Sequence, residues 1–150
     1  MKKVIYIIVA ILIIIQFIPA NLPEISSDNP NDLLTNNPDI SEDIAQILRA
    51  SCYDCHSNET YYPWYSYFAP ISFLVSRDTK VGREELNFSD WESYKKTEKA
   101  GALDGISDLI AEGEMPMKIY TIIHRDDALS ESEIEIMVNW ADEFAESLFE

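Results

Sequence analysis

Two cysteines and a histidine stand close together in the middle of the chain, in the segment Cys52-Tyr53-Asp54-Cys55-His56. Two thiols separated by two residues and followed directly by histidine form the spacing used for covalent haem attachment. Each thiol can add to one vinyl group at the same edge of the porphyrin, and the adjacent histidine then lies under the iron as its proximal ligand. The motif therefore predicts one covalent haem c, bound through Cys52 and Cys55, with its iron on His56.

Other interpretations of these side chains have less support from the sequence. A disulfide between Cys52 and Cys55 is one alternative, because these are the only two cysteines in the chain. A thioredoxin-like redox pair needs a βαβ setting, which the helical periodicity of the chain does not offer. A zinc site needs four ligands, and the only other histidine is His124. Haem is the preferred interpretation because the motif and the expected fold class agree.

A sixth iron ligand is expected further along the chain. Methionine is the usual partner of histidine where the iron carries electrons, because a thioether raises the reduction potential. Met115 and Met117 follow Gly113 in an irregular Gly-Glu-Met-Pro-Met segment, which can deliver a side chain to a metal without helical constraint. We expect Met115 to be the ligand, with Met117, His124 or an open position as alternatives.

An aromatic stretch from Tyr61 to Phe68 follows the motif. A haem edge needs apolar cover, and Tyr and Trp side chains can also donate hydrogen bonds to the propionates. Trp64 and Tyr65 are therefore expected to contact the cofactor. Ordinary aromatic packing in the core is the alternative for each of them.

Apolar residues recur at helical spacing from about residue 40 to the C-terminus, without a strand pattern. The best-defined helix is the last one, which Ser130 and Glu133 open as a capping box. The fold class is predicted to be all-α, a cytochrome c-like helical domain around one haem.

The N-terminus carries Lys2 and Lys3 and then an apolar run from Val4 to Ile18 that only Gln16 interrupts. Such a run is typical of a signal anchor or of a signal peptide. We expect an uncleaved anchor over residues 1–20, a flexible linker over residues 21–38 and the haem domain over residues 39–150. The positive-inside rule then predicts a single-pass protein of the inner membrane with its haem domain in the periplasm. A cleaved periplasmic form is the alternative.

The chain is strongly acidic, with 27 Asp and Glu residues against 11 Lys and Arg residues and a formal net charge of −16. Phosphate binding needs clustered Lys and Arg, so this balance argues against nucleic acid as a partner. It favours a redox partner protein with a basic docking surface.

Further segments accompany the cysteine motif. They are residues 51–60 (SCYDCHSNET), 62–65 (YPWY), 69–70 (AP), 82–84 (GRE), 86–89 (LNFS) and 113–116 (GEMP), with Trp91, Tyr120, His124, residues 128–130 (ALS) and Trp140. With these segments the chain resembles the bacterial haem-binding domain family, small c-type cytochrome-like proteins, over about residues 40 to 142. The resemblance implies a c-type haem domain and puts Met115 at the family's Gly-Glu-Met-Pro position. It does not decide the function, because the family is named for its cofactor.

Electron transfer is the expected function, because the chain has one haem motif, a candidate sixth ligand and no evident acid–base constellation. An electron carrier of this kind is not an enzyme. The alternative is a haem-based sensor of small ligands, or a peroxidase-like enzyme, with an exchangeable sixth ligand.

Overall fold

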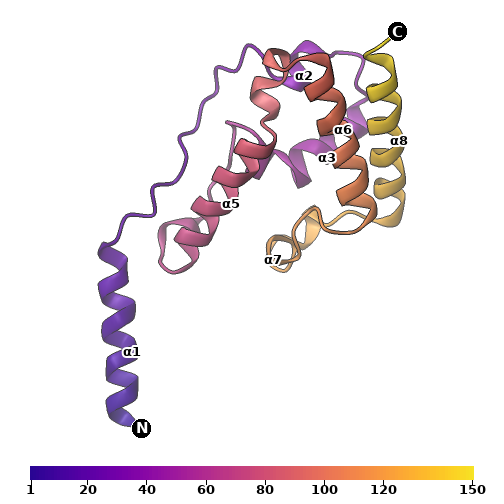
Figure 1. Ribbon diagram of the computed structural model, residues 1–150. Coiled ribbons are helices and arrows are strands. Elements are labelled where there is room, and N and C mark those ends of the chain that lie inside the picture. The colour runs from indigo at the N-terminus through magenta and orange to yellow at the C-terminus, as the bar shows by residue number, and fades with distance from the viewer.

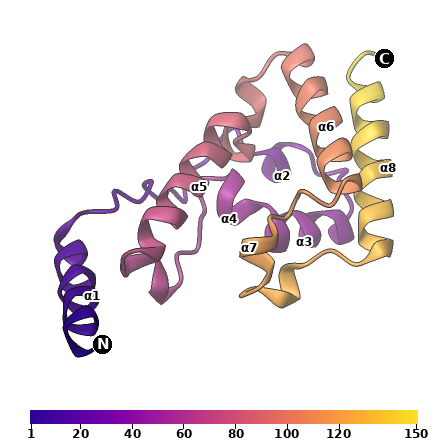
Figure 2. The ribbon, with the colours of Figure 1, turned by 60° about the horizontal axis from the view of Figure 1, so that its bottom comes forward.

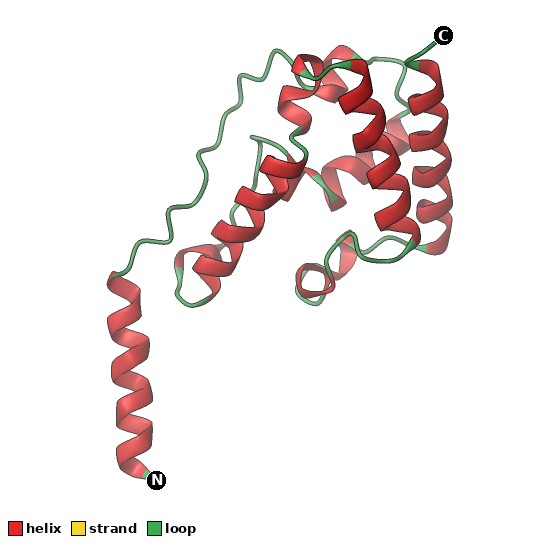
Figure 3. Cartoon of the chain, in the orientation of Figure 1, coloured by secondary structure: helices red, strands yellow, loops and turns green.

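The computed structural model describes all 150 residues, and its regular structure is entirely helical (Figure 3). The predicted all-α class is confirmed. In chain order the elements are α1 (Lys2–Ile14), η1 (Ile15–Phe17), α2 (Leu33–Asn36), α3 (Glu42–Ser51), α4 (Tyr53–His56), η2 (Trp64–Tyr67), α5 (Ile71–Glu85), η3 (Phe88–Ser93), α6 (Lys96–Ala111), α7 (Lys118–Thr121), η4 (Arg125–Asp127) and α8 (Glu131–Ser147), where η denotes a 3-10 helix.

The two longest helices, α6 and α8, lie side by side and run in opposite directions (Figures 1 and 2). Helix α8 begins at the predicted capping box. The Ser130 amide donates to Glu133 Oε2 over 2.8 Å, and the Glu133 amide donates to Ser130 Oγ over 3.3 Å. Two otherwise unpaired amides at the helix start are thereby satisfied, so the last helix begins where the sequence predicts.

The hydrophobic core lies where α3, η3, α6 and α8 meet. Trp91 is fully buried, and its ring lies beside those of Tyr94 and Phe144 with centroid distances of 6.2 and 6.0 Å. Large aromatic side chains dominate the apolar area that a small core removes from water. The buried apolar residues are Leu33, Ile47, Leu48, Tyr53, Leu86, Phe88, Trp91, Leu103, Ile110, Met137, Trp140 and Ala141.

Part of the segment expected to be a linker belongs to this packed body. Leu33 is fully buried, and Asp32 is 2% exposed. Asp32 Oδ1 caps α2 by accepting from the Thr35 amide over 3.0 Å, and its Oδ2 accepts from the Tyr53 hydroxyl over 3.0 Å. The packed body therefore begins near Asp32, whereas the sequence placed the boundary at residues 38 and 39. The composition of this segment, which is rich in asparagine and proline, gave no sign that Asp32 and Leu33 would be buried.

The extended segment before Asp32 is also held to the body. It runs from η1 to α2 on the same side as α5 (Figure 1). The Tyr62 hydroxyl donates to the Pro23 carbonyl over 3.0 Å, and Arg83 Nη1 donates to the Glu24 carbonyl over 2.7 Å. Side chains of the body thus provide the hydrogen bonds that this irregular backbone cannot make internally.

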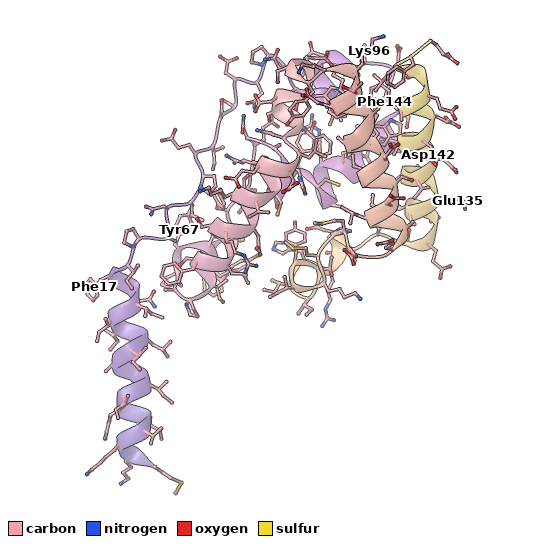
Figure 4. The ribbon with its side chains drawn as sticks, in the orientation of Figure 1. Phe17, Tyr67, Lys96, Glu135, Asp142 and Phe144 are labelled. Carbon is pink, nitrogen blue, oxygen red and sulfur yellow. The ribbon has the colours of Figure 1, made fainter.

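The N-terminal helix α1 projects from the body (Figure 1), and the exposed Phe17 lies at its junction with the extended segment (Figure 4). Its 13 residues span about 20 Å at 1.5 Å per residue, whereas the hydrocarbon core of a bilayer is about 30 Å thick. None of the helices combines the length and the apolar character needed to cross a membrane. The expected single-pass membrane anchor is therefore wrong.

Candidate haem site

The cysteine motif occupies the junction of two helices. Helix α3 ends at Ser51 and α4 begins at Tyr53, so Cys52 is the residue between them, with φ −125° and ψ −43°. The chain continues in helical geometry through Cys55 to His56. Side chains three and four residues apart share one face of a helical turn, but in this structure Cys55 lines a cavity, Cys52 packs against the core and His56 packs against Leu86 and Phe88.

His56 has a defined tautomer. Its Nδ1 lies 3.0 Å from the backbone carbonyl oxygen of Leu86, which can only accept a hydrogen bond. Nδ1 is therefore the protonated nitrogen, and Nε2 keeps the lone pair that a metal requires. The ring meets Phe88 edge-on, with a centroid distance of 6.3 Å. Burial lowers the pKa of His56 and so favours the neutral form, which is the form that binds iron.

Helix α5 approaches the motif closely. A Cβ atom on Gly82 would lie 2.7 Å from the Cys55 carbonyl oxygen and 3.3 Å from the Cys55 Cβ. Glycine is thus required where α5 crosses α4. The close approach also brings Leu86, four residues further along, to the side of α4 that carries His56.

Both cysteines are free thiols, so the disulfide left open by the sequence does not form here. Burial raises the pKa of Cys52 to about 12 and that of Cys55 to about 11. The charge of Asp54 adds to the effect on Cys55. Both sulfurs are therefore held in the protonated form at neutral pH.

A cavity lies next to α4, and Figure 2 shows α4 between α5 and α7. Its volume is about 90 Å³, or about 620 Å³ when the adjoining space that is open to solvent is included. Most of its lining residues are hydrophobic. The lining includes Cys55 from α4, Tyr65 from η2, Leu74 and Val75 from α5, and Tyr120 and Ile123 from the α7 segment.

The residues present fit a haem. The evidence is the tautomer of His56, which leaves Nε2 available to iron, and the mostly apolar cavity beside Cys55. No group of three or more His, Cys, Asp or Glu side chains could hold a metal ion unaided. A haem does not need such a group, because the porphyrin holds the iron and the protein supplies only axial ligands.

Residues 10–143 match the family described as "Haem-binding domain". The chain belongs to the haem-binding domain family. The resemblance predicted from the sequence is confirmed, and haem is the cofactor. Comparison with curated proteins and with solved structures gave no match. The cytochrome c-like arrangement of the helices therefore stays a prediction.

The other predicted site residues of this haem-binding domain divide into two groups. Tyr65, Met117 and His124 line the cavity together with Cys55. Met115 is partly buried and packs against the hydrophobic core instead. Trp64 is 75% exposed and does not line the cavity. Cys52 packs against the same core as Met115.

A polar cluster on one side of the cavity was only partly foreseen. His124 Nδ1 lies 3.3 Å from Asp127 Oδ2, and His124 Nε2 is hydrogen-bonded to the Tyr65 hydroxyl. The Tyr120 ring stacks on His124 with a centroid distance of 4.4 Å. The Tyr120 hydroxyl oxygen lies 3.1 Å from Asp54 Oδ2 and 2.8 Å from Asp127 Oδ2. We call these five residues the histidine cluster.

The sequence proposed His124 and Tyr65 as site residues, whereas Tyr120 and Asp54 appeared only within matched segments and Asp127 was not singled out. The available signal was the spacing of Tyr120 and Asp127, four residues before and three residues after His124. Both ring nitrogens of His124 are engaged within the cluster. In this arrangement Tyr65 occupies the Nε2 position that an iron atom would otherwise take.

Proposed function

We propose that this haem-binding protein carries one covalent haem c and works as a one-electron carrier. Thioether bonds would form when each thiol S–H adds across a vinyl C=C, with the sulfur on one carbon and the hydrogen on the other. Cys52 and Cys55 would supply these thiols, and His56 would ligate the iron through Nε2. The observation that carries the proposal is the hydrogen bond from His56 Nδ1 to Leu86, which prepares a ligand directly after the two thiols.

When bound, the haem supplies one-electron chemistry at its iron. The chain would tune that chemistry through the sixth ligand. We propose a methionine thioether, because His124 uses both ring nitrogens within the protein. Met115 is the first candidate from the family resemblance, and Met117, which lines the cavity, is the alternative.

The proposed partner is a redox protein with a basic surface. The chain carries a formal net charge of −16, and acidic residues such as Glu135 and Asp142 lie along α8 (Figure 4). Opposite charges on two proteins raise the rate at which they meet, and salt screens this attraction. The rate of electron transfer to a basic acceptor protein should therefore fall as ionic strength rises.

The test is a set of optical spectra of the haem-loaded full chain in its oxidised and reduced states. A reversible one-electron change, with a near-infrared thioether band in the oxidised form and rapid oxidation by a basic redox protein, would support the proposal. A haem that cannot be cycled reversibly, or a reduced protein that passes no electron to such an acceptor, would reject it.

A haem-based sensor or peroxidase-like enzyme is a second candidate. The observation that favours it is His124, which lines the cavity and has its Nδ1 3.3 Å from Asp127 Oδ2. Rapid binding of carbon monoxide to the reduced protein, or turnover of peroxide, would favour this function. A six-coordinate iron that resists both ligands would favour the electron carrier.

A further inference from the structure

The exposed apolar side chains of this protein gather in three segments, residues 1–23, 60–77 and 115–125. None of the three segments contains an Asp or Glu residue, although the chain has 27 of them. Outside these segments the exposed large hydrophobic residues are only Ile25, Val81, Leu109, Ile136 and Phe149. The chain therefore separates most of its exposed apolar surface from its negative charges.

The three segments adjoin one another in the structure. The side-chain amide of Gln16 donates to the Ala69 carbonyl over 2.9 Å and accepts from the Ala69 amide over 3.0 Å. The Tyr65 hydroxyl is hydrogen-bonded to His124, which links η2 to the segment that follows α7. In Figure 1 all three segments lie at the end of the molecule away from the C-terminus. We call the exposed surface of residues 1–23, 60–77 and 115–125 the apolar face.

The part of the apolar face that belongs to the packed body is rich in aromatic side chains. Trp64 and Tyr67 of η2 and the following Phe68 are all exposed, and so is Ile122 directly after α7. Figure 4 shows Tyr67 on this body and Phe17 where α1 meets the extended segment. Trp and Tyr are enriched where a membrane meets water, because their rings combine an apolar body with a polar group. The side-chain types of this face therefore suit a lipid surface.

Helix α1 distinguishes lipid from a protein groove as the occupant of the apolar face. Every residue from Val4 to Ile14 is hydrophobic, and none of the helix is buried. A groove on a protein covers one side of a helix, whereas a helix that is apolar all round is ordinarily enclosed by apolar material. Because α1 is too short to cross a bilayer, it can enter the lipid only from one side.

The charges of the apolar face favour an anionic lipid. Its only Lys and Arg residues are Lys2, Lys3, Arg77, Lys118 and Arg125, and all five are exposed. Anionic headgroups attract cations near a membrane surface, whereas they repel Asp and Glu. The acidic remainder of the chain would be kept in water, with the apolar face turned toward the lipid.

We propose that the protein docks on an anionic lipid surface through the apolar face, with α1 entering the lipid without crossing it and η2 and the α7 segment resting on it. Interfacial binding of this kind gains strength from buried apolar area together with attraction to anionic headgroups. The proposal goes beyond the electron-carrier function and does not depend on it. The cavity beside Cys55, lined by Tyr65 and Ile123, would then lie close to the lipid.

The experiment measures how the haem-loaded full chain partitions onto vesicles of phosphatidylcholine and phosphatidylglycerol in equal parts, by sedimentation over a range of lipid concentrations. The test variants are W64S and I122S, since both side chains are exposed and neither lines the cavity. Each should weaken binding about tenfold, the usual effect of losing one buried large apolar side chain. W64F, which keeps an aromatic ring, should bind nearly as well as the unaltered chain.

F149S is the matched control, because Phe149 is exposed near the C-terminus, away from the apolar face. It should bind vesicles like the unaltered chain. Failure of the full chain to bind these vesicles overturns the proposal, and so does binding that W64S and I122S leave unchanged. A stable oligomer in the absence of lipid that W64S or I122S dissociates would show that a second copy covers the face, which also overturns it. Circular dichroism and haem content of each variant identify a folding defect.

Discussion

Gly82 of α5 packs directly against the backbone of Cys55, because a Cβ atom on Gly82 would lie only 2.7 Å from the Cys55 carbonyl oxygen. This relationship fixes the distance between α5 and the short helix that carries the cysteine motif. The same helix α5 leads directly to Leu86, whose carbonyl sets the tautomer of His56. The position of one glycine therefore governs the geometry of the proposed iron ligand.

We expect Gly82→Ala to destabilise the fold, because the new methyl group must push α5 away from α4. Overpacking of this kind costs about 1–3 kcal/mol, which urea unfolding of the full chain would measure. Gly101→Ala is the control, since a Cβ there has no atom within 4 Å and alanine favours a helix over glycine by about 0.5–1 kcal/mol. Equal effects of the two substitutions would contradict the close contact at Gly82.

Tyr53→Phe tests whether Asp32 belongs to the folded body. The substitution removes the hydroxyl that donates to Asp32 Oδ2 and leaves a buried carboxylate oxygen without its partner. We expect a loss of about 1–3 kcal/mol in the free energy of unfolding. Tyr61→Phe, on a ring that is 76% exposed, should change stability by less than about 0.5 kcal/mol. A neutral result for Tyr53→Phe would mean that the segment around Asp32 does not pack as described.

Stability should also decline in alkaline solution. Burial, followed by the charge of Asp32, raises the pKa of Tyr53 above its ordinary value, which is about 10. Above that pH the unfolded chain loses the phenolic proton while the folded chain keeps it, so the free energy of unfolding falls as pH rises. Below it the contribution of this group is fully present. Unfolding curves between pH 8 and 11 should show the decline, and Tyr53→Phe should make it shallower.

The sequence predicted those features that depend on local spacing. The helical class and the capping box of Ser130 and Glu133 each follow from neighbouring residues, and the structure contains both. The predicted membrane span was wrong because helix α1, although apolar, has only 13 residues and is too short to cross a membrane.

Features that depend on tertiary contact could not be predicted in the same way. Asp32 becomes an anchor only when Tyr53, 21 residues away, packs against it. The histidine cluster combines Asp54 and Tyr65 with residues about 60 positions further along the chain. Such pairings leave no periodic pattern in one sequence, so the sequence proposed His124 and Tyr65 separately and did not indicate that they contact each other.

The sixth ligand can be assigned with two substitutions in the haem-loaded protein. If Met115 binds the iron, Met115→Ala should abolish the near-infrared thioether band of the oxidised form and lower the reduction potential. Met117→Ala should then leave both unchanged. The opposite pattern would assign Met117, which lines the cavity in this structure. Survival of the band in both variants would exclude both methionines.

The covalent bond between chain and haem is the claim on which the account depends most. We would measure the intact mass of the haem-loaded chain under denaturing conditions, in a host competent to attach haem c, beside Cys52→Ala, Cys55→Ala and the double variant. The account predicts one haem retained on the unaltered chain and none on the double variant. A full-length chain that folds and binds haem, but releases all of it on denaturation, would contradict the account.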